Sequence, residues 1–149
     1  MHQTHATLEQ SAREEIESLH VFFVAWFSGR CTKESFTENF SSRFHPDFKL
    51  IPPAGTLLNL EQLSSAIHNG YASNPPFKIQ IRNVKLQRTF EDHMLVTYEE
   101  WQQYALASTS PNNGRIASAV FKTNQPLEWI HIHETWLPET IQKADNYHF

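Results

Sequence analysis

The chain has 149 residues and carries 12 basic and 16 acidic side chains, which give a formal net charge of −4 at neutral pH. This length indicates one domain, and a composition of 40% hydrophobic and 13% aromatic residues excludes a disordered chain. The acidic balance argues against binding to nucleic acid through phosphate neutralisation, and the single cysteine excludes an internal disulfide framework and a cysteine-based zinc site.

The first part of the chain is predicted to be helical. Residues 1–10 are polar and resemble a flexible leader. Apolar residues at three- and four-residue steps predict a helix over 12–28, with Gly29 as a left-handed stop. Phenylalanines at four-residue steps predict a short helix over 36–44, which ends before a proline. A third helix is predicted over 59–69, capped at its first residue by an asparagine.

The remainder is predicted to form strands that alternate between apolar and polar residues. A slip in the alternation between Ile81 and Val84 predicts a β-bulge or bend. Helices followed by antiparallel strands predict an α+β fold, with helices packed on a strongly curved sheet. We expect one domain over 11–138 and a C-terminal tail over 139–149. The predicted strands cover residues 48–51, 77–86, 94–104, 116–122 and 127–137.

Three stretches resemble the NTF2-like superfamily, and the resemblance covers residues 12–138. They are AWFSGR at the end of the first helix, FHPDFKLIPPAG with its P-x-G turn, and RIASAVFK followed by LEWIHIHETWLP. The last pair is similar to the final strands of SnoaL-like and DUF4440-type members and of the calcium/calmodulin-dependent kinase association domain. The resemblance implies a cystatin-like cone with an apolar pocket inside, and a homodimer formed through the outer face of the sheet. It implies no cofactor.

The last predicted strand supplies the main candidate for chemistry, Glu134. By alternation Ile132, Glu134 and Trp136 share one face, which the resemblance to the association domain places toward the pocket. A buried carboxylate needs a partner, a proton or a wet pocket. A four-residue turn at 123–126 would place Arg115 opposite Glu134. Glu134 is therefore a candidate catalytic acid or base or a ligand acceptor, and a purely structural ion pair with Arg115 stays open.

The predicted strand 94–104 offers two faces, one with Tyr98 and Glu100 and the other with Glu99 and Trp101. Which of them points inward stays open at this point, and we favour the face with Tyr98 and Glu100. Repulsion between Glu100 and Glu134 would raise the pKa of one carboxyl, as general acid catalysis requires. A solvated pair of glutamates beyond the edge of the cone is the open alternative.

Aromatic and histidine residues elsewhere are weaker candidates. Trp26, Phe48 and Tyr71 are expected either to line the pocket or to fill the core. His131 and His133 lie two apart on one strand and so point the same way, as metal ligands can. Because no third ligand is recognisable, we predict no metal site.

Three functions are open at this point. The first is binding of a small apolar or aromatic molecule by a homodimer, and it is the one we expect. The second is an acid–base enzyme, of isomerase, cyclase or dehydratase type, that acts on an apolar ring compound through Glu134. The third is a dimerisation module without a ligand.

Two further observations bear on these functions. Ketosteroid isomerases share the implied fold, but matching places Phe22 and Pro52 where they carry a catalytic tyrosine and aspartate, which argues against that chemistry. No stretch is apolar enough to cross a membrane and no signal segment is visible, so we expect a cytoplasmic protein without a membrane or nucleic-acid partner.

Overall fold

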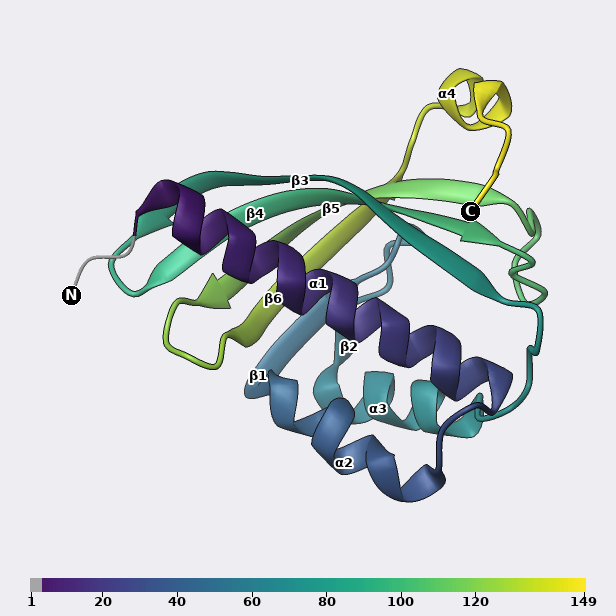
Figure 1. Cartoon of the computed structure of the whole chain (residues 1–149), viewed down its shortest axis with the longest axis horizontal. Coiled ribbons are helices and arrows are strands. Elements are labelled where there is room, and N and C mark those ends of the chain that lie inside the picture. The colour runs from purple at the N-terminus through teal and green to yellow at the C-terminus, as the bar shows by residue number, and fades with distance from the viewer. Residues whose placement is uncertain (1–3) are drawn as a thin grey trace.

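The computed structural model describes residues 4–149 and shows helices packed on one curved sheet (Figure 1). One-turn 3-10 helices at Lys33–Ser35 and Ser41–Arg43 flank the second helix. Within the described residues the main elements are α1 (His5–Ser28), α2 (Phe36–Asn39), β1 (Phe44–Ile51), β2 (Leu58–Asn59), α3 (Leu60–Asn69), β3 (Lys78–Phe90), β4 (His93–Gln103), β5 (Asn113–Lys122), β6 (Glu128–Trp136) and α4 (Glu139–Ala144).

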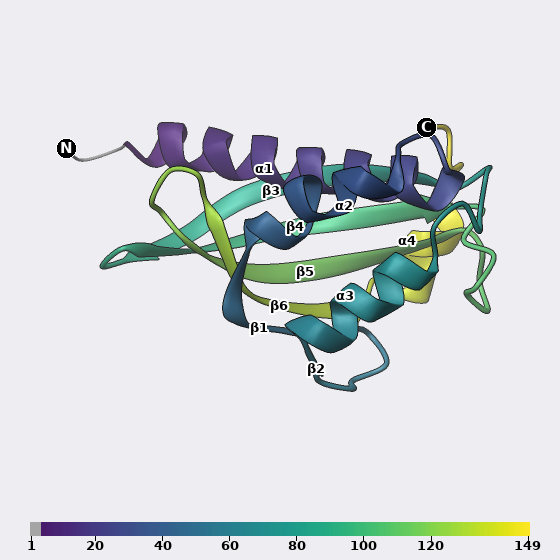
Figure 2. The ribbon, with the colours of Figure 1, turned by 90° about the horizontal axis from the view of Figure 1, so that it is seen from below.

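The six strands form one mixed sheet in the order β2-β1-β6-β5-β4-β3. Figure 2 shows α1, α2 and α3 gathered on one side of this twisted sheet, which curls around them. The predicted α+β architecture is confirmed. One detail differs from the expected antiparallel sheet, because β1 pairs with β6 in parallel. No hairpin joins these two strands, so nothing in the local chain forces them to run in opposite directions.

Helix α1 begins at His5, seven residues before the predicted start at Ala12. The Thr4 side chain caps it by accepting a hydrogen bond from the backbone N–H of Thr7 at 3.1 Å. Leu8, buried on the same stripe as the later apolar residues, explains why the helix extends this far. Most of the expected leader is therefore helical, and its residues 1–3 lie outside the described part of the chain.

The added turns of α1 cover the free edge of the sheet. The backbone N–H of Leu86 on β3 donates to the Glu9 carboxylate at 2.9 Å, and Arg13 donates to the Val84 carbonyl at 3.3 Å. These bonds occupy backbone groups that an unpaired edge strand would otherwise offer to another chain.

Bulges on β3 and β6 set which side chains face the core. The slip predicted between Ile81 and Val84 is confirmed, because the β3–β4 register shifts there and Asn83 adopts a left-handed φ of 55°. The same pairing shifts again between Leu86 and Arg88. The bulge on β6 was not expected. The β5–β6 register shifts at Ile130, which turns Trp129 into the core, away from the face of His131 on which alternation placed it.

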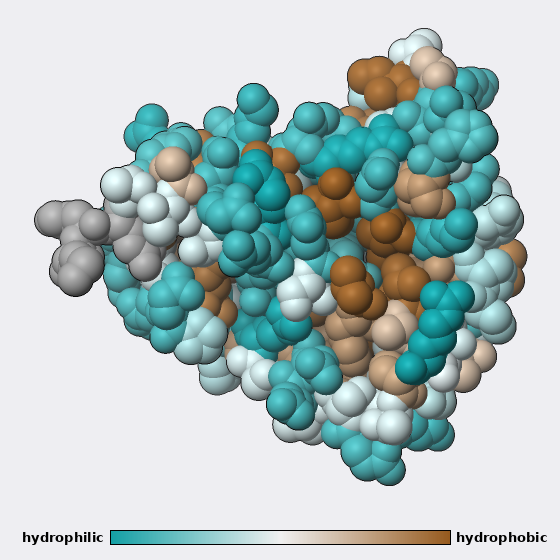
Figure 3. Space-filling view, in the orientation of Figure 1, coloured by the Kyte–Doolittle hydropathy of each residue, from teal (hydrophilic) through white to brown (hydrophobic). Residues whose placement is uncertain are grey.

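The surface is largely polar, with apolar side chains exposed where α1 borders β3 (Figure 3). Val21 is the most exposed of them. The expected tail contains α4, and beyond it Asp145 forms an ion pair with Arg82 of β3 at 2.8 Å. No helix within residues 4–149 is long and apolar enough to cross a membrane.

Candidate functional site

A pocket of about 650 Å³ opens between the helices and the concave face of the sheet. This volume lies in the range of small-molecule sites, which are mostly apolar with a few placed polar groups. The apolar walls include Leu19, Phe23, Phe27, Leu63, Ile67 and Phe77. The polar side chains that reach it include His20, Tyr98, Glu100, Gln102, Arg115 and Glu134.

Three of these polar side chains converge because of the strand register around Ala117. Tyr98 on β4 and Glu134 on β6 both lie directly opposite Ala117, one on each side of β5. Arg115 is two residues from Ala117 and so shares its face. Since an alanine side chain is a single methyl group, the longer side chains around it can approach one another above the sheet.

Glu134 and Arg115 form a buried ion pair, with 3.3 Å between the carboxylate and the guanidinium. The pairing is diagonal, because Arg115 lies opposite Trp136 and not opposite Glu134 as the predicted turn required. Relative to the predicted register, β6 is shifted along β5 by one residue at the turn, where Lys122 lies opposite Glu128. It is shifted by one more residue at the Ile130 bulge. A shift of two keeps the side chains from His131 to Trp136 on their predicted faces, and diagonal neighbours are still within reach of an arginine.

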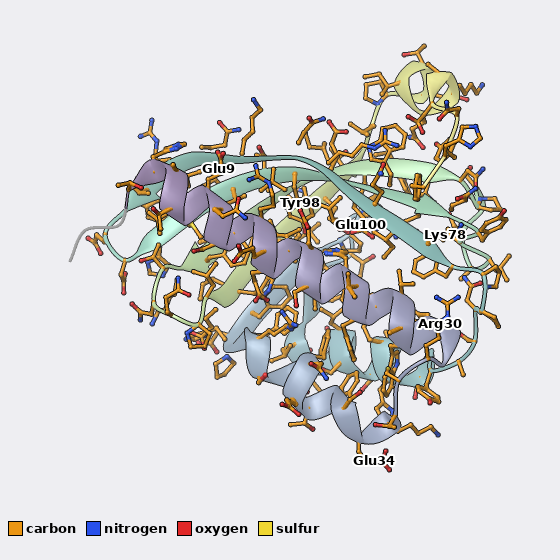
Figure 4. All side chains as sticks on the ribbon, in the orientation of Figure 1. Glu9, Arg30, Glu34, Lys78, Tyr98 and Glu100 are labelled. Atoms are coloured by element: carbon orange, nitrogen blue, oxygen red, sulfur yellow. The ribbon has the colours of Figure 1, made fainter. Side chains whose placement is uncertain are left out.

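A histidine from α1 completes the cluster. His20 Nε2 lies 3.0 Å from the Glu100 carboxylate, and His20 Nδ1 lies 2.7 Å from the Ile16 carbonyl. Both partners are acceptors, so the imidazole donates from both nitrogens when it is protonated. Burial would lower the pKa of His20, but the Glu100 charge and hydrogen bond outweigh burial and raise it. In Figure 4 the labelled Tyr98 and Glu100 lie beside the middle of α1, over the strands of the sheet.

Glu100 and Glu134 have different neighbours, which shift the pKa values of their carboxyl groups in opposite directions. Burial and the charge of Glu100 raise the pKa of Glu134 to about 7, against the opposing effect of Arg115. Burial would also raise the pKa of Glu100, but the charge and hydrogen bond of His20, followed by Arg115 and Gln102, hold it below its ordinary value. Glu100 is therefore the permanent anion, while Glu134 can gain or lose a proton near neutrality.

Three buried polar atoms of residues that line the pocket have no hydrogen-bond partner among residues 4–149. They are the hydroxyl oxygen of Tyr98, which is only 1% exposed, the Nε of Arg115 and the Oδ1 of Asn74. Burial, followed by the charges of Glu134 and Glu100, raises the pKa of Tyr98 well above 10, so its hydroxyl keeps its proton. A buried polar group without a partner is costly, and one that faces a pocket marks a position for a ligand atom.

The other predicted pocket residues are placed as follows. Ile132 lines the pocket, whereas Trp26 and Phe48 are fully buried in the core and do not reach it. Tyr71 is also outside the lining and donates its hydroxyl to the Cys31 carbonyl at 2.6 Å. Trp136 shares the face of Glu134 but lies beyond the lining, where it is 44% exposed and stacks under the Arg115 guanidinium at 4.9 Å.

The sequence missed His20 and Gln102, of which His20 had a readable signal. It lies four residues after Ile16 and three before Phe23, so it falls on the apolar stripe of α1, where a lone histidine needs a buried partner.

His131 and His133 lie on the outer face of β6. Burial, together with the neighbouring His133 and Lys49, lowers the pKa of His131. The described residues hold no group of three or more potential ligands arranged around a metal ion.

Comparison with known proteins defines the family. A family model described as the C-terminal domain of sucrose-6-phosphate phosphohydrolase matches residues 12–138. The chain belongs to this family. It is 22% identical over 139 residues to a probable sucrose-phosphatase 2 of Arabidopsis thaliana, and this match covers 89% of the chain but only 32% of that protein. The chain thus spans about a third of the length of the curated relative.

Solved structures show that the chain has the expected NTF2-like, cystatin-like fold. An NTF2-like protein of unknown function from Pseudomonas aeruginosa superposes with a TM-score of 0.76 at 23% identity, covering 86% of this chain and 99% of the other. The association domain of the calcium/calmodulin-dependent kinase II of C. elegans superposes with a TM-score of 0.59 at 16% identity, covering 85% of this chain and 97% of the other.

The raised pKa of Glu134 predicts how the stability of the protein changes with pH. The folded state holds this proton up to pH about 7, whereas the unfolded chain releases it near 4.5, so raising the pH across this window lowers the free energy of unfolding. Glu134→Gln cannot titrate. Urea unfolding at pH 5 and pH 8 gives the free energy of unfolding at each pH. We expect its decrease from pH 5 to pH 8 to be smaller in this variant than in the wild type, by on the order of 1–3 kcal/mol.

The matched control is Glu128→Gln, on the same strand but outside the pocket lining. Its stability should fall with pH as much as that of the wild type. The pKa of His20 is also raised, so His20 contributes to the fall in the free energy of unfolding in all three proteins. Equal falls in the wild type and Glu134→Gln would contradict the assignment.

Proposed function

We propose that the chain binds a small, largely apolar molecule that carries a hydrogen-bonding head group, in the pocket between the helices and the sheet. The observation that carries the proposal is the Tyr98 hydroxyl, which is buried at the base of the pocket without a partner among residues 4–149. Leaving such a group unpaired costs free energy that a ligand atom would recover.

The lining supports an apolar body for the ligand. Aromatic rings from α1 and from the segment before β3, those of Phe23, Phe27 and Phe77, line the pocket. Removing an apolar surface from water against such walls is favourable in proportion to its area. The polar groups of the cluster would fix the orientation of the molecule.

A sugar phosphate, which the name of the plant relative brings to mind, fits this pocket poorly. Its many hydroxyl groups would lose water against walls that are mostly apolar. Its phosphate would also bring nearly two negative charges beside Glu100, which stays ionised, whereas a proton on Glu134 offsets only one charge. We therefore place the ligand of this domain in a different chemical class from the substrate named for that relative.

Acid–base catalysis is a second candidate, and one observation favours it. The pKa of Glu134 is raised to about 7, where a carboxyl can both donate and accept protons at physiological pH. Glu134 would then exchange a proton with a bound ring compound, held by Tyr98. Conversion of the bound compound, as opposed to its recovery unchanged, distinguishes an enzyme from a binding protein.

2-Naphthol and naphthalene test the binding proposal, because they differ by one hydroxyl group. We expect fluorescence titration to show 2-naphthol binding more tightly than naphthalene. Tyr98→Phe should weaken 2-naphthol binding by roughly 2- to 13-fold, the value of one neutral hydrogen bond, and leave naphthalene binding unchanged. Tyr71→Phe is the matched control, since Tyr71 lies outside the lining. Failure of both compounds to bind would contradict the proposal.

We further propose that two copies of the chain pair through the outer face of the sheet. Figure 2 shows α1, α2 and α3 on one side of the sheet, so the opposite side of β5 and β6 carries none of these helices. Ile116 on that side is 38% exposed, and Val120 lies four residues further along the same face of β5, beyond Ser118. A two-fold pair would bury this surface against its own copy.

Light scattering of the purified chain tests the pairing. We expect a mass of twice 17.4 kDa for the wild type. Ile116→Asp should give the single-chain mass, because it places a charge in the shared surface. Ile141→Asp, at an exposed position on α4, is the control and should remain paired. A single-chain mass for the wild type at every concentration would refute the pairing.

A further inference from the structure

We propose that the head group of the ligand is a carboxylate, held by the Tyr98 hydroxyl and the Arg115 Nε, and that Glu134 takes up a proton when the ligand binds. This inference rests on the proposed binding function. It adds the charge of the ligand and the coupling of binding to a proton.

The groups of the polar cluster that lack a hydrogen-bond partner are donors, so they favour a ligand head group that accepts hydrogen bonds. The Arg115 Nε can only donate, and the Tyr98 hydroxyl keeps a proton that it can donate. Both oxygens of Glu100 are already engaged, by His20 and by Gln102. A ligand carboxylate offers two acceptor oxygens, and hydrogen bonds to charged groups are the stronger kind.

The strand register places these two donors side by side. Tyr98 lies opposite Ala117, while Arg115 is two residues from Ala117 on the same face of β5, so they are diagonal neighbours on adjacent strands. Glu134 lies opposite Ala117 on the other side. A carboxylate at this part of the pocket would thus meet Tyr98, Arg115 and Glu134 together.

Charge balance explains the proton. With His20 protonated and Glu134 ionised, the cluster of His20, Glu100, Arg115 and Glu134 has two positive and two negative charges. A ligand carboxylate would add a buried negative charge without a counterion, which is costly. Protonation of Glu134 restores neutrality. Because burial and Glu100 already raise the pKa of Glu134 to about 7, this proton is taken up easily at physiological pH.

The groups that face Glu134 come from three elements. They are His20 on α1, Tyr98 and Glu100 on β4, and Arg115 on β5. Among the described residues, α3 and the loop at 105–108 contribute no titratable side chain to the lining. Glu134 is therefore the group in this set whose charge changes most readily near neutral pH.

Calorimetric titration with 2-naphthoate between pH 6 and pH 8.5 tests the inference. If Glu134 must be protonated, the affinity should fall roughly 30-fold over this range, as expected for one proton and a pKa of about 7. Parallel titrations in two buffers with different heats of ionisation should show proton uptake that approaches one per ligand at pH 8.5.

Substitutions of Glu134 give opposite results for a binding role and for a folding defect. Glu134→Gln resembles the protonated carboxyl, so it should bind 2-naphthoate at pH 8.5 roughly tenfold or more tightly than the wild type, with little dependence on pH. A variant that merely folds badly would bind more weakly at every pH. Glu128→Gln, the matched control, should behave as the wild type does. Tyr98→Phe should lose roughly tenfold or more in affinity for 2-naphthoate.

The outcomes separate this inference from the proposal on which it rests. If 2-naphthol binds with a dependence on Tyr98 but 2-naphthoate binds more weakly and without proton uptake, the carboxylate inference is overturned and the binding function stands. If neither compound binds, both are overturned. If 2-naphthoate binds equally well to the wild type and to Glu134→Gln at pH 8.5, the proton coupling is overturned.

Discussion

The site depends on charge balance among four ionisable groups that are buried together. His20, Glu100, Arg115 and Glu134 lie where neither a lone anion nor a lone cation would be tolerated. His20 fixes Glu100 as an anion, and Glu100 in turn opposes ionisation of Glu134. The proton on Glu134 is therefore set by the whole cluster, and any ligand that brings a charge into the pocket must change it.

The fold brings these groups together through a small residue and an even shift in register. Ala117 leaves room between Tyr98 and Glu134, which approach from opposite sides of β5. The extra residue at the turn and the bulge at Ile130 each move β6 by one position, and together they preserve which side chains face inward. Either shift alone would turn the Glu134 side chain toward the outer face of the sheet.

Regular alternation along strands is the reason that much of the site could be predicted. It placed Ile132 and Glu134 on one face of β6, and Tyr98 and Glu100 together on one face of β4, which lines the pocket. Alternation alone did not decide which face of β4 points inward. The exact register could not be predicted, because the bulge at Ile130 leaves no clear mark in the sequence of β6. Nor could the partner of Glu100, since His20 comes from a helix 80 residues earlier in the chain. Helical spacing likewise could not tell whether Trp26 would fill the core or line the pocket.

The most direct test is to titrate the Glu134 side-chain carboxyl and follow it by carbon-13 NMR in protein labelled at glutamate. The signal of Glu134 is identified by its absence from the spectrum of Glu134→Gln. The account predicts a midpoint near pH 7, set by burial and by the neighbouring Glu100. A midpoint near 4.5, the ordinary value for glutamate, would show that Glu134 is neither buried nor coupled to the cluster, and would contradict the central claim.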